Sequence, residues 1–166
     1  MGARVLTMDG GERALSELQR AALDAELSVD LLLRESYGDL AARSLLIAMI
    51  VRRPALVARC AGPADVIRAV KFASYNELFV AVRGEGHNIA GMGVGDGGVL
   101  IDLCGLRSVH VYPVRRVSSV DAGGTLVELD DETHVYGIAV PTGIISTTGI
   151  AGLTLGGVFG WLSRKH

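Results

Sequence analysis

The sequence predicts an α+β fold, in one domain or two small lobes, on three observations. A strand–helix–strand pattern occupies residues 55–83, a short hairpin follows at 109–120, and a capped helix covers 125–136. The chain has 166 residues, of which 49% are hydrophobic and 20% are charged. A chain of this length and composition can bury a core, which favours a globular protein over a disordered one.

Two helical stretches are expected ahead of the strands. Residues 11–27 are rich in helix formers, and their leucines recur at helical spacing. Residues 39–51 carry a second apolar stripe and should end before Pro54, because the residue preceding a proline disfavours helix. We therefore expect residues 1–50 to form an N-terminal helical segment that serves packing.

The strand–helix–strand unit begins after Pro54. Residues 55–60 and 79–83 are apolar and have the length of strands. Between them, Gly62 is placed as a helix cap, with Pro63 at the first helical position and Asp65 in the first turn. Two strands joined by one helix are most economically parallel and linked by a right-handed crossover.

Three further elements follow along the chain. Residues 99–103 form a third strand, and residues 109–112 and 116–120 form a hairpin with shorter, more polar strands. The helix expected over 125–136 begins at Thr125 as its cap, and Glu128 supplies the matching residue three positions on. Gly137 closes this helix.

Charge and cysteine content argue against several kinds of site. The formal net charge is -2 and the basic residues are scattered, so no nucleic-acid partner is expected. Cys60 and Cys104 are too few for a disulfide framework, and the four histidines lack zinc-ligand spacing, so no metal site is expected. The N-terminus lacks the long apolar run of a secretory signal. We therefore expect a reducing, cytoplasmic setting.

A long glycine-rich loop, residues 83–98, follows the second strand directly. Loops of this length inside a compact domain usually carry a function. Glycines let backbone N–H groups approach a ligand and converge on it, as a pyrophosphate requires. The spacing is not that of the dinucleotide fingerprint, because Ile89 takes the place of its third glycine. By its residues alone, the loop is either a phosphate cradle with His87 at the ligand or a structural turn with a surface histidine.

Residues 141–161 form a second glycine-rich segment, in which small hydroxyl residues stand beside glycines. Hydroxyls and free backbone amides suit a buried, extended, polar ligand. The alternative is a membrane helix, because residues 135–163 carry no charge and Gly152, Gly156 and Gly160 recur every four residues. Pro141 and the polar run 146–149 dilute the apolarity below that of a typical span, which disfavours a membrane protein.

Several of these segments, in this order, resemble one known family. The stretches RRPALVARCAGPADVIRAVKFA, VAVRGEGHNIAG, VLIDL and TGIISTTGIAGLTLGGVFGWLSRKH are similar to the berberine-bridge-enzyme-like branch of FAD-linked oxidases. This branch belongs to the vanillyl-alcohol oxidase and p-cresol methylhydroxylase (PCMH) superfamily. The resemblance covers about residues 40–166. It implies a two-lobed PCMH-type FAD-binding domain over residues 51–166, with the second lobe incomplete and FAD extended between the lobes.

The resemblance also implies which residues bind FAD. His87 matches the histidine that bonds covalently to the flavin 8α-methyl group, which raises the flavin potential. Val140 stands where some members have a second attachment through cysteine, so attachment through His87 alone is expected. The implied FAD-binding residues are Arg83, Gly84, Glu85, Gly86, His87, Asn88 and Gly91 in the first loop, and Thr142, Gly143, Ser146, Thr147, Thr148, Gly149, Gly152 and Gly156 in the second segment.

Two features depart from the family pattern. Glu85 stands where the family usually has glycine, and a carboxylate beside a pyrophosphate is repulsive unless it turns to solvent or pairs with a cation such as Arg83. The chain also ends at His166, where relatives continue into the part that supplies the catalytic base and substrate walls. The sequence therefore identifies neither a catalytic residue nor a substrate.

Three functions follow, in order of support. The first is the FAD-binding domain of an FAD-dependent oxidoreductase that oxidises CH–OH or similar groups, passes electrons to O2, and binds a small-molecule substrate once a missing domain completes it. The second is a flavin-binding or scaffold remnant without turnover, favoured by the chain end and Glu85. The third is a small membrane-associated protein. If the apolar segment 135–163 is exposed, it should promote self-association.

Overall fold

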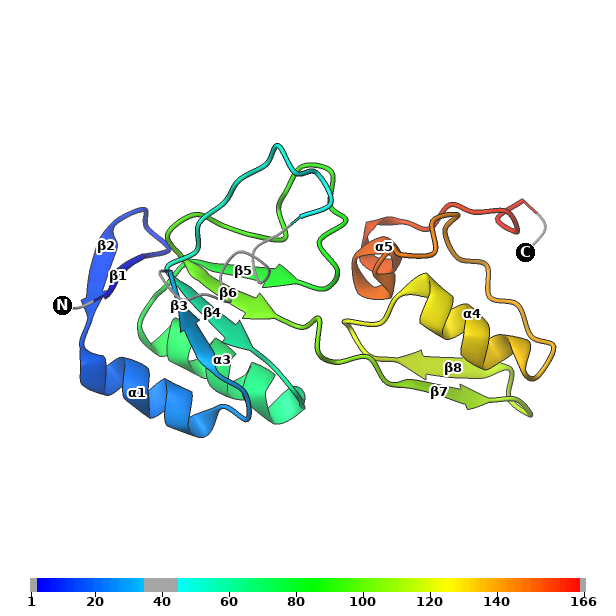
Figure 1. The fold of residues 1–166 in the computed structure, drawn as a ribbon, viewed down its shortest axis with the longest axis horizontal. Helices are drawn as coiled ribbons and strands as arrows, with labels where there is room; N and C mark the ends of the chain where they lie inside the picture. The colour runs from blue at the N-terminus through cyan, green and yellow to red at the C-terminus, as the bar shows by residue number, and fades with distance from the viewer. Residues whose placement is uncertain (1–2, 35–44, 165–166) are drawn as a thin grey trace.

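The computed structural model describes residues 3–34 and 45–164, which form two lobes (Figure 1). The first lobe is built around a four-stranded sheet, and the second around a hairpin and a helix. The first lobe contains β1 (Ala3–Leu6), β2 (Glu12–Leu15), α1 (Glu17–Glu26), β3 (Leu31–Leu33), β4 (Leu56–Arg59), α3 (Pro63–Tyr75), β5 (Val80–Arg83) and β6 (Val99–Asp102). The second contains β7 (Val109–Tyr112), β8 (Val117–Val120), α4 (Leu126–His134) and α5 (Ile150–Gly156). The expected α+β, two-lobed class is confirmed.

The central sheet has the strand order β3-β4-β6-β5. β4 and β5 both run parallel to β6, and β3 is antiparallel to β4. The expected parallel strand–helix–strand unit is therefore present as β4-α3-β5, but its two strands do not pair with each other. β6 lies between them, so the ends of β5 and β6 lie side by side where the glycine loop begins.

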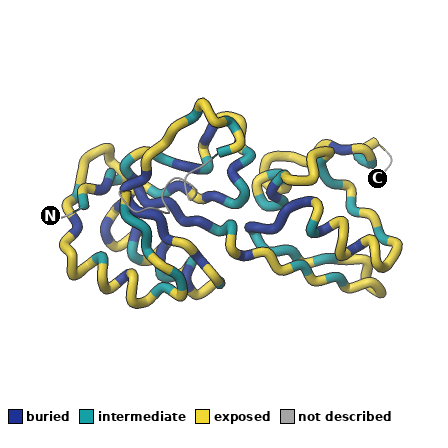
Figure 2. Tube along the Cα trace, in the orientation of Figure 1, coloured by how far each residue is buried: buried dark blue, intermediate teal, exposed yellow. Residues whose placement is uncertain are grey.

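The sheet is buried on both faces because its strands alternate between two apolar clusters. Leu56 and Ile101 belong to the cluster that includes Ala69 and Ala73 of α3. Their neighbours Val57 and Leu100 belong to a second cluster, with Val94 of the glycine loop. Figure 2 shows the buried strands at the centre of the first lobe. The long loop after β5 is thereby anchored on the sheet through Val94.

The capping residues in the sequence correctly predicted where two helices begin. α3 begins at Pro63 with Gly62 as its cap, and α4 begins after Thr125, as expected. In α4 the backbone N–H and the hydroxyl of Thr125 both donate to Glu128 Oε2, each at 2.8 Å. These bonds satisfy donors that a helix start would leave unpaired. They also fix Glu128 at the beginning of α4, which matters for the site below.

The N-terminal part differs from the expectation of helix over 11–27. Its helix begins only at Glu17, because Ser16 and Gln19 form a capping box there, and residues 12–15 instead pair with β1. Leu15 is fully buried with Val5, so tertiary packing outweighs the helical preference of the stretch. Within the helix expected over 39–51, residues 45–51 form turns and bends, and residues 39–44 lie outside the described residues.

The second lobe is smaller and less enclosed. α4 packs on the β7–β8 hairpin and buries Leu126, Leu129 and Thr133. α5 was not expected as a separate helix, and it buries none of its residues; Leu155 is 90% exposed. Among the described residues no helix has both the length and the apolar character needed to cross a membrane.

Candidate functional site

The loop after β5 lies beside α5 (Figure 1). Residues of both line a cavity of about 640 Å³. The two glycine-rich segments singled out by the sequence therefore line one space. The end of β5 contributes Val82 and Arg83, and the loop after it contributes Gly84, Glu85, Gly86, His87, Asn88, Ile89, Ala90, Met92 and Gly93. The second segment contributes Thr148, Gly149, Gly152, Leu153, Gly156 and Gly157.

Two glycines allow the lobes to approach each other at the base of this cavity. A Cβ on Gly84 would lie 2.8 Å from the carbonyl oxygen of Ala122. A Cβ on Gly149 would lie 2.8 Å from the Cβ of Glu85. Both distances are shorter than real Cβ contacts, so a side chain at either position would push the two segments apart. The glycines here serve close backbone approach.

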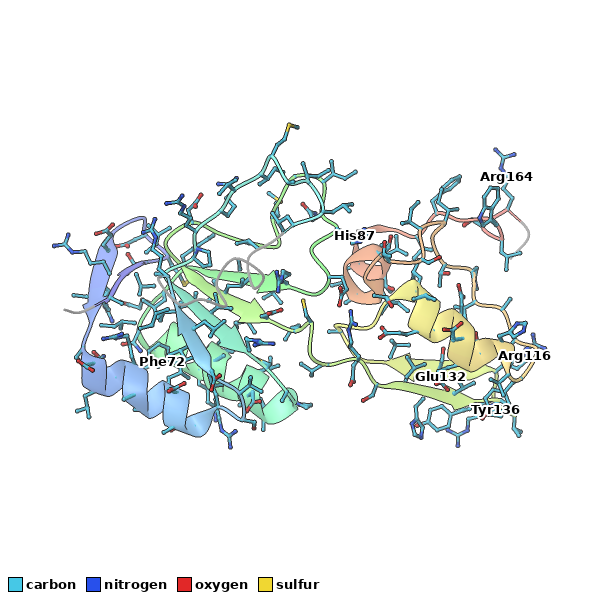
Figure 3. All side chains as sticks on the ribbon, viewed as in Figure 1. Phe72, His87, Arg116, Glu132, Tyr136 and Arg164 are labelled. Atoms are coloured by element: carbon cyan, nitrogen blue, oxygen red, sulfur yellow. The ribbon has the colours of Figure 1, made fainter. Side chains whose placement is uncertain are left out.

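His87 lies at the junction of the two segments, beside α5 (Figure 3). Its side chain is half-buried, and its Nδ1 is 3.4 Å from the Thr148 hydroxyl. The two residues are 61 positions apart in the sequence. The loop histidine therefore lies in the cavity wall and is not a remote surface residue.

The loop offers backbone donors to this cavity. Within the described part of the chain, the N–H groups of residues 84–88 donate no hydrogen bond. Gly86 is buried and has a φ of 73°, a conformation that glycine adopts without strain. Buried N–H groups in native proteins are almost always paired. Gly86 is the buried residue among these five, so its unpaired N–H, together with the more exposed amides beside it, fits a ligand rich in acceptor oxygens, as the diphosphate of a dinucleotide is.

The charges around the loop are paired differently from the expectation. Arg83 was the suggested partner of Glu85, but its guanidinium is buried and donates to Asp102, with Nη2 2.9 Å from Oδ2. Glu85 instead pairs with Arg107, whose Nη2 lies 2.5 Å from Oε1. Arg107 also approaches Glu128 at 3.5 Å. Sequence reasoning missed Arg107, because a residue 22 positions from Glu85 has no local pattern that points to the pair.

Two other groups at the loop have shifted pKa values. The backbone N–H of Thr125 is the main cause that lowers the pKa of Glu128, which keeps this carboxylate charged beside Arg107. Burial raises the pKa of Cys104 to about 12, and its thiol donates to the Gly84 carbonyl at 2.6 Å. A thiol with such a pKa is not a nucleophile at neutral pH. Cys104 therefore acts as a structural support of the loop.

The structure brings ten of the fifteen expected cofactor residues to the cavity and places the others elsewhere. Gly91 packs on Ile50, and Gly143 packs on Leu153 and Leu126. Val140 lies at a different cavity, beside the β7–β8 hairpin. The expected residues that do not line the cavity are Gly91, Thr142, Gly143, Ser146 and Thr147.

Comparisons with known proteins identify the family of this region. The family described as an FAD binding domain matches residues 54–166. The (R)-6-hydroxynicotine oxidase of Paenarthrobacter nicotinovorans is 34% identical over 116 residues, which are 70% of this chain and 25% of that protein. Berberine bridge enzyme-like 18 of Arabidopsis thaliana is 34% identical over 120 residues, covering 70% of this chain and 23% of that protein.

Solved structures show the same fold. The crystal structure of 6-hydroxy-D-nicotine oxidase from Arthrobacter nicotinovorans superposes with a TM-score of 0.80 at 30% identity, over 84% of this chain and 31% of that one. Wild-type BBE-like 1 of Physcomitrella patens gives a TM-score of 0.80 at 26% identity, over 87% of this chain and 32% of that one.

The chain thus spans about a quarter of the length of the curated relatives described above. What it shares with them is the part that carries the glycine loop, the parallel strands and the second glycine-rich segment. The chain is similar to berberine-bridge-enzyme-like and other FAD-linked proteins, and it belongs to the FAD binding domain family.

Proposed function

We propose that the cavity between residues 84–88 and α5 holds FAD, with the diphosphate on the free N–H groups and His87 bonded to the flavin. The observation that carries the proposal is that two distant glycine-rich segments line one cavity with the His87 imidazole in its wall. The free amides supply donors without adding side-chain bulk. The membership in an FAD-binding family supports the choice of this dinucleotide over others.

The protein's part in the attachment is to orient the imidazole. The Thr148 hydroxyl lies within reach of His87 Nδ1 and can hold the ring in one orientation. His87 would hold the flavin through a bond from an imidazole nitrogen to the 8α carbon; this bond would replace one N–H and one C–H bond, and O2 would take up the two electrons and two protons as hydrogen peroxide. The bound flavin would supply the oxidation chemistry of the whole enzyme. The chain would supply its position.

We propose that the complete protein is an oxidoreductase that takes electrons from CH–OH or similar groups of a small molecule and passes them to O2. Relatives described as oxidases support this reaction class. The titratable residues among the described cavity lining are Arg83, Glu85 and His87, and the first two are in ion pairs. The catalytic base and most substrate contacts would therefore come from residues outside the described lining of this cavity.

Covalent attachment can be tested on the purified chain. The protein is reconstituted with FAD, denatured in acid and digested, and the peptide that contains His87 is examined for flavin absorbance and added mass. We expect flavin on this peptide in the wild type and none in His87→Ala. His110→Ala is the control, because His110 is exposed on the hairpin and should leave the attachment intact. Flavin retained covalently in His87→Ala would contradict the proposal.

We also propose that the chain works in the reducing cytoplasm, where its free thiols Cys60 and Cys104 would stay reduced. A further proposal is self-association through the apolar end of the second lobe. Leu155, Phe159 and Trp161 are 90%, 72% and 87% exposed. Figure 2 shows this end of the chain as largely exposed. Apolar surface of this kind favours association of copies.

A further inference from the structure

We propose that Arg107 is the positioning residue that makes the glycine loop compatible with the cofactor diphosphate. It does so by holding the Glu85 carboxylate in an ion pair, so that the loop presents no unpaired negative charge to the cofactor. This inference rests on the proposed function, because it assumes that the diphosphate binds at residues 84–88.

The Glu85 carboxylate is only partly exposed to solvent. Its side chain is 18% exposed and lies in the cavity wall. The backbone N and Cβ of Glu85 also abut Gly149, since a Cβ on that glycine would lie 3.1 and 2.8 Å from them. A charge held in this way must be neutralised in place if an anion is to bind beside it.

Arg107 is held on three sides, which fixes its charge at Glu85. Nη2 forms the ion pair with Glu85 Oε1, and Nη1 is 3.5 Å from Glu128 Oε1. Nε donates to the carbonyl oxygen of Cys104 at 3.1 Å. The planar guanidinium fork is suited to such simultaneous contacts, whereas a lysine ammonium is a point charge. Arg107 therefore ties the loop of the first lobe to α4 of the second.

The other cation near the loop, Arg83, forms its ion pair with Asp102. Arg83 precedes the loop, and its guanidinium is buried. Glu128 also approaches Arg107, but at the longer distance of 3.5 Å, and Thr125 holds its other carboxylate oxygen at the start of α4, so it does not displace Glu85 from the guanidinium. In the region that the structure describes, Arg107 is thus the cation that balances Glu85.

Loss of Arg107 should weaken FAD binding. With the pair intact, Glu85 and Arg107 together carry no net charge beside the amides. Without Arg107, a carboxylate stands next to a diphosphate that carries two negative charges. For charges separated by several ångströms near a protein surface, this repulsion weakens binding by about tenfold or more. Salt screens exposed charges, so the loss should shrink as ionic strength rises.

Reversible FAD binding tests the proposal when it is measured by flavin fluorescence quenching in a His87→Ala background, where no covalent bond forms. We expect Arg107→Met to bind FAD about tenfold more weakly at low salt. Adding Glu85→Gln should restore binding to within about threefold of the parent, because the repelling charge is gone. Arg115→Met is the matched control, since it removes an exposed positive charge from the distant hairpin turn.

Glu85→Gln alone and Arg107→Lys keep the test decisive if Arg107→Met folds poorly. The first should bind FAD at least as tightly as the parent, and the second should retain most of the affinity. Unchanged binding in Arg107→Met, or a double variant as weak as Arg107→Met, would overturn the inference and leave the proposed function standing. A wild-type chain that binds no FAD, covalently or reversibly, would overturn the proposed function and this inference together.

Discussion

Arg83 and Asp102 form a buried ion pair at the adjacent ends of β5 and β6, with Nε and Nη2 of the guanidinium on the two carboxylate oxygens at 3.3 and 2.9 Å. Both side chains are 6% exposed. Because removal of one partner leaves an uncompensated buried charge, we expect Asp102→Asn to lower the free energy of unfolding by about 3 kcal/mol. Urea denaturation followed by circular dichroism measures the change.

Two variants check that the effect comes from the pair. Arg83→Met combined with Asp102→Leu should regain at least half of the loss, because no buried charge is left alone. Glu12→Gln breaks an exposed pair with Arg4 and should change stability by less than about 1 kcal/mol. Equal losses in the single and double variants would show that the ion pair is not the cause.

Asp65 gives the first lobe an acid-sensitive contact. The carboxyl is 1% exposed. Burial raises its pKa, but hydrogen bonds from the Ala61 N–H and from the N–H and hydroxyl of Ser28, together with Arg68, outweigh it and hold the pKa below its usual value. Stability from such a lowered pKa is present above about pH 4 and is lost as the pH falls through the folded-state value.

We therefore expect Asp65→Asn to be less stable than the wild type at pH 7 by about 1–3 kcal/mol, because an NH2 donor replaces one of the two carboxylate oxygens that accept these buried hydrogen bonds. The difference in unfolding free energy between the variant and the wild type should become smaller below about pH 4, where the wild type loses the contribution of this carboxylate. The stability of Ser28→Ala at pH 7 should lie between those of the wild type and Asp65→Asn, since this variant removes one hydrogen-bond donor to Asp65. Urea titrations at a series of pH values test this, and parallel curves for all three proteins would refute it.

Gly149 should tolerate no side chain, whereas Gly152 should. A Cβ on Gly149 would meet Glu85 at 2.8 Å, but one on Gly152 would meet nothing within 4 Å. In the absence of flavin, we expect Gly149→Ala to lose about 1–3 kcal/mol of stability through overpacking. Gly152→Ala should be neutral or gain up to about 1 kcal/mol, because alanine favours helix. Thermal unfolding of the two variants makes the comparison, and equal melting temperatures would argue against a close contact at Gly149.

Self-association should depend on the exposed apolar end of the second lobe. Sedimentation velocity over a concentration series should show association of the wild type and a shift towards monomer in Leu155→Ser with Trp161→Ser. Met8→Ser is the control, because Met8 is 77% exposed in the first lobe. Trp161 is the single tryptophan, so its emission should shift to shorter wavelength as copies associate. A concentration-independent monomer would contradict the expectation.

The parts of the fold that sequence predicted depend on contacts between near neighbours. The start of α3 could be predicted from Gly62 and Pro63, and the start of α4 from Thr125 and Glu128. Such signals are local, because capping residues bond to residues within one turn of the helix. β2 was missed because its residues become a strand only through pairing with β1, and Leu15 reaches burial only in the assembled lobe. Local preference could not reveal that contact.

In the candidate site, too, the local patterns could be predicted from the sequence, whereas the contacts between distant residues could not. His87 and the glycine loop could be singled out because a histidine among glycines is a local pattern, and the resemblance to a known family supplied the role. The contact of His87 with Thr148 and the Glu85–Arg107 pair join distant parts of the chain. Such pairs depend on how the two lobes meet, which the sequence pattern did not specify.

The insertion of β6 between β4 and β5 sets an order for folding during synthesis. The β4-α3-β5 unit leaves the ribosome before the strand that both of its edges require, so the sheet cannot close until residues 99–102 have emerged. Until then, the loop that precedes β6 must remain loose enough for the strand to slide into place. We therefore expect the glycines of this loop to ease the assembly of the lobe, apart from any part they have in binding.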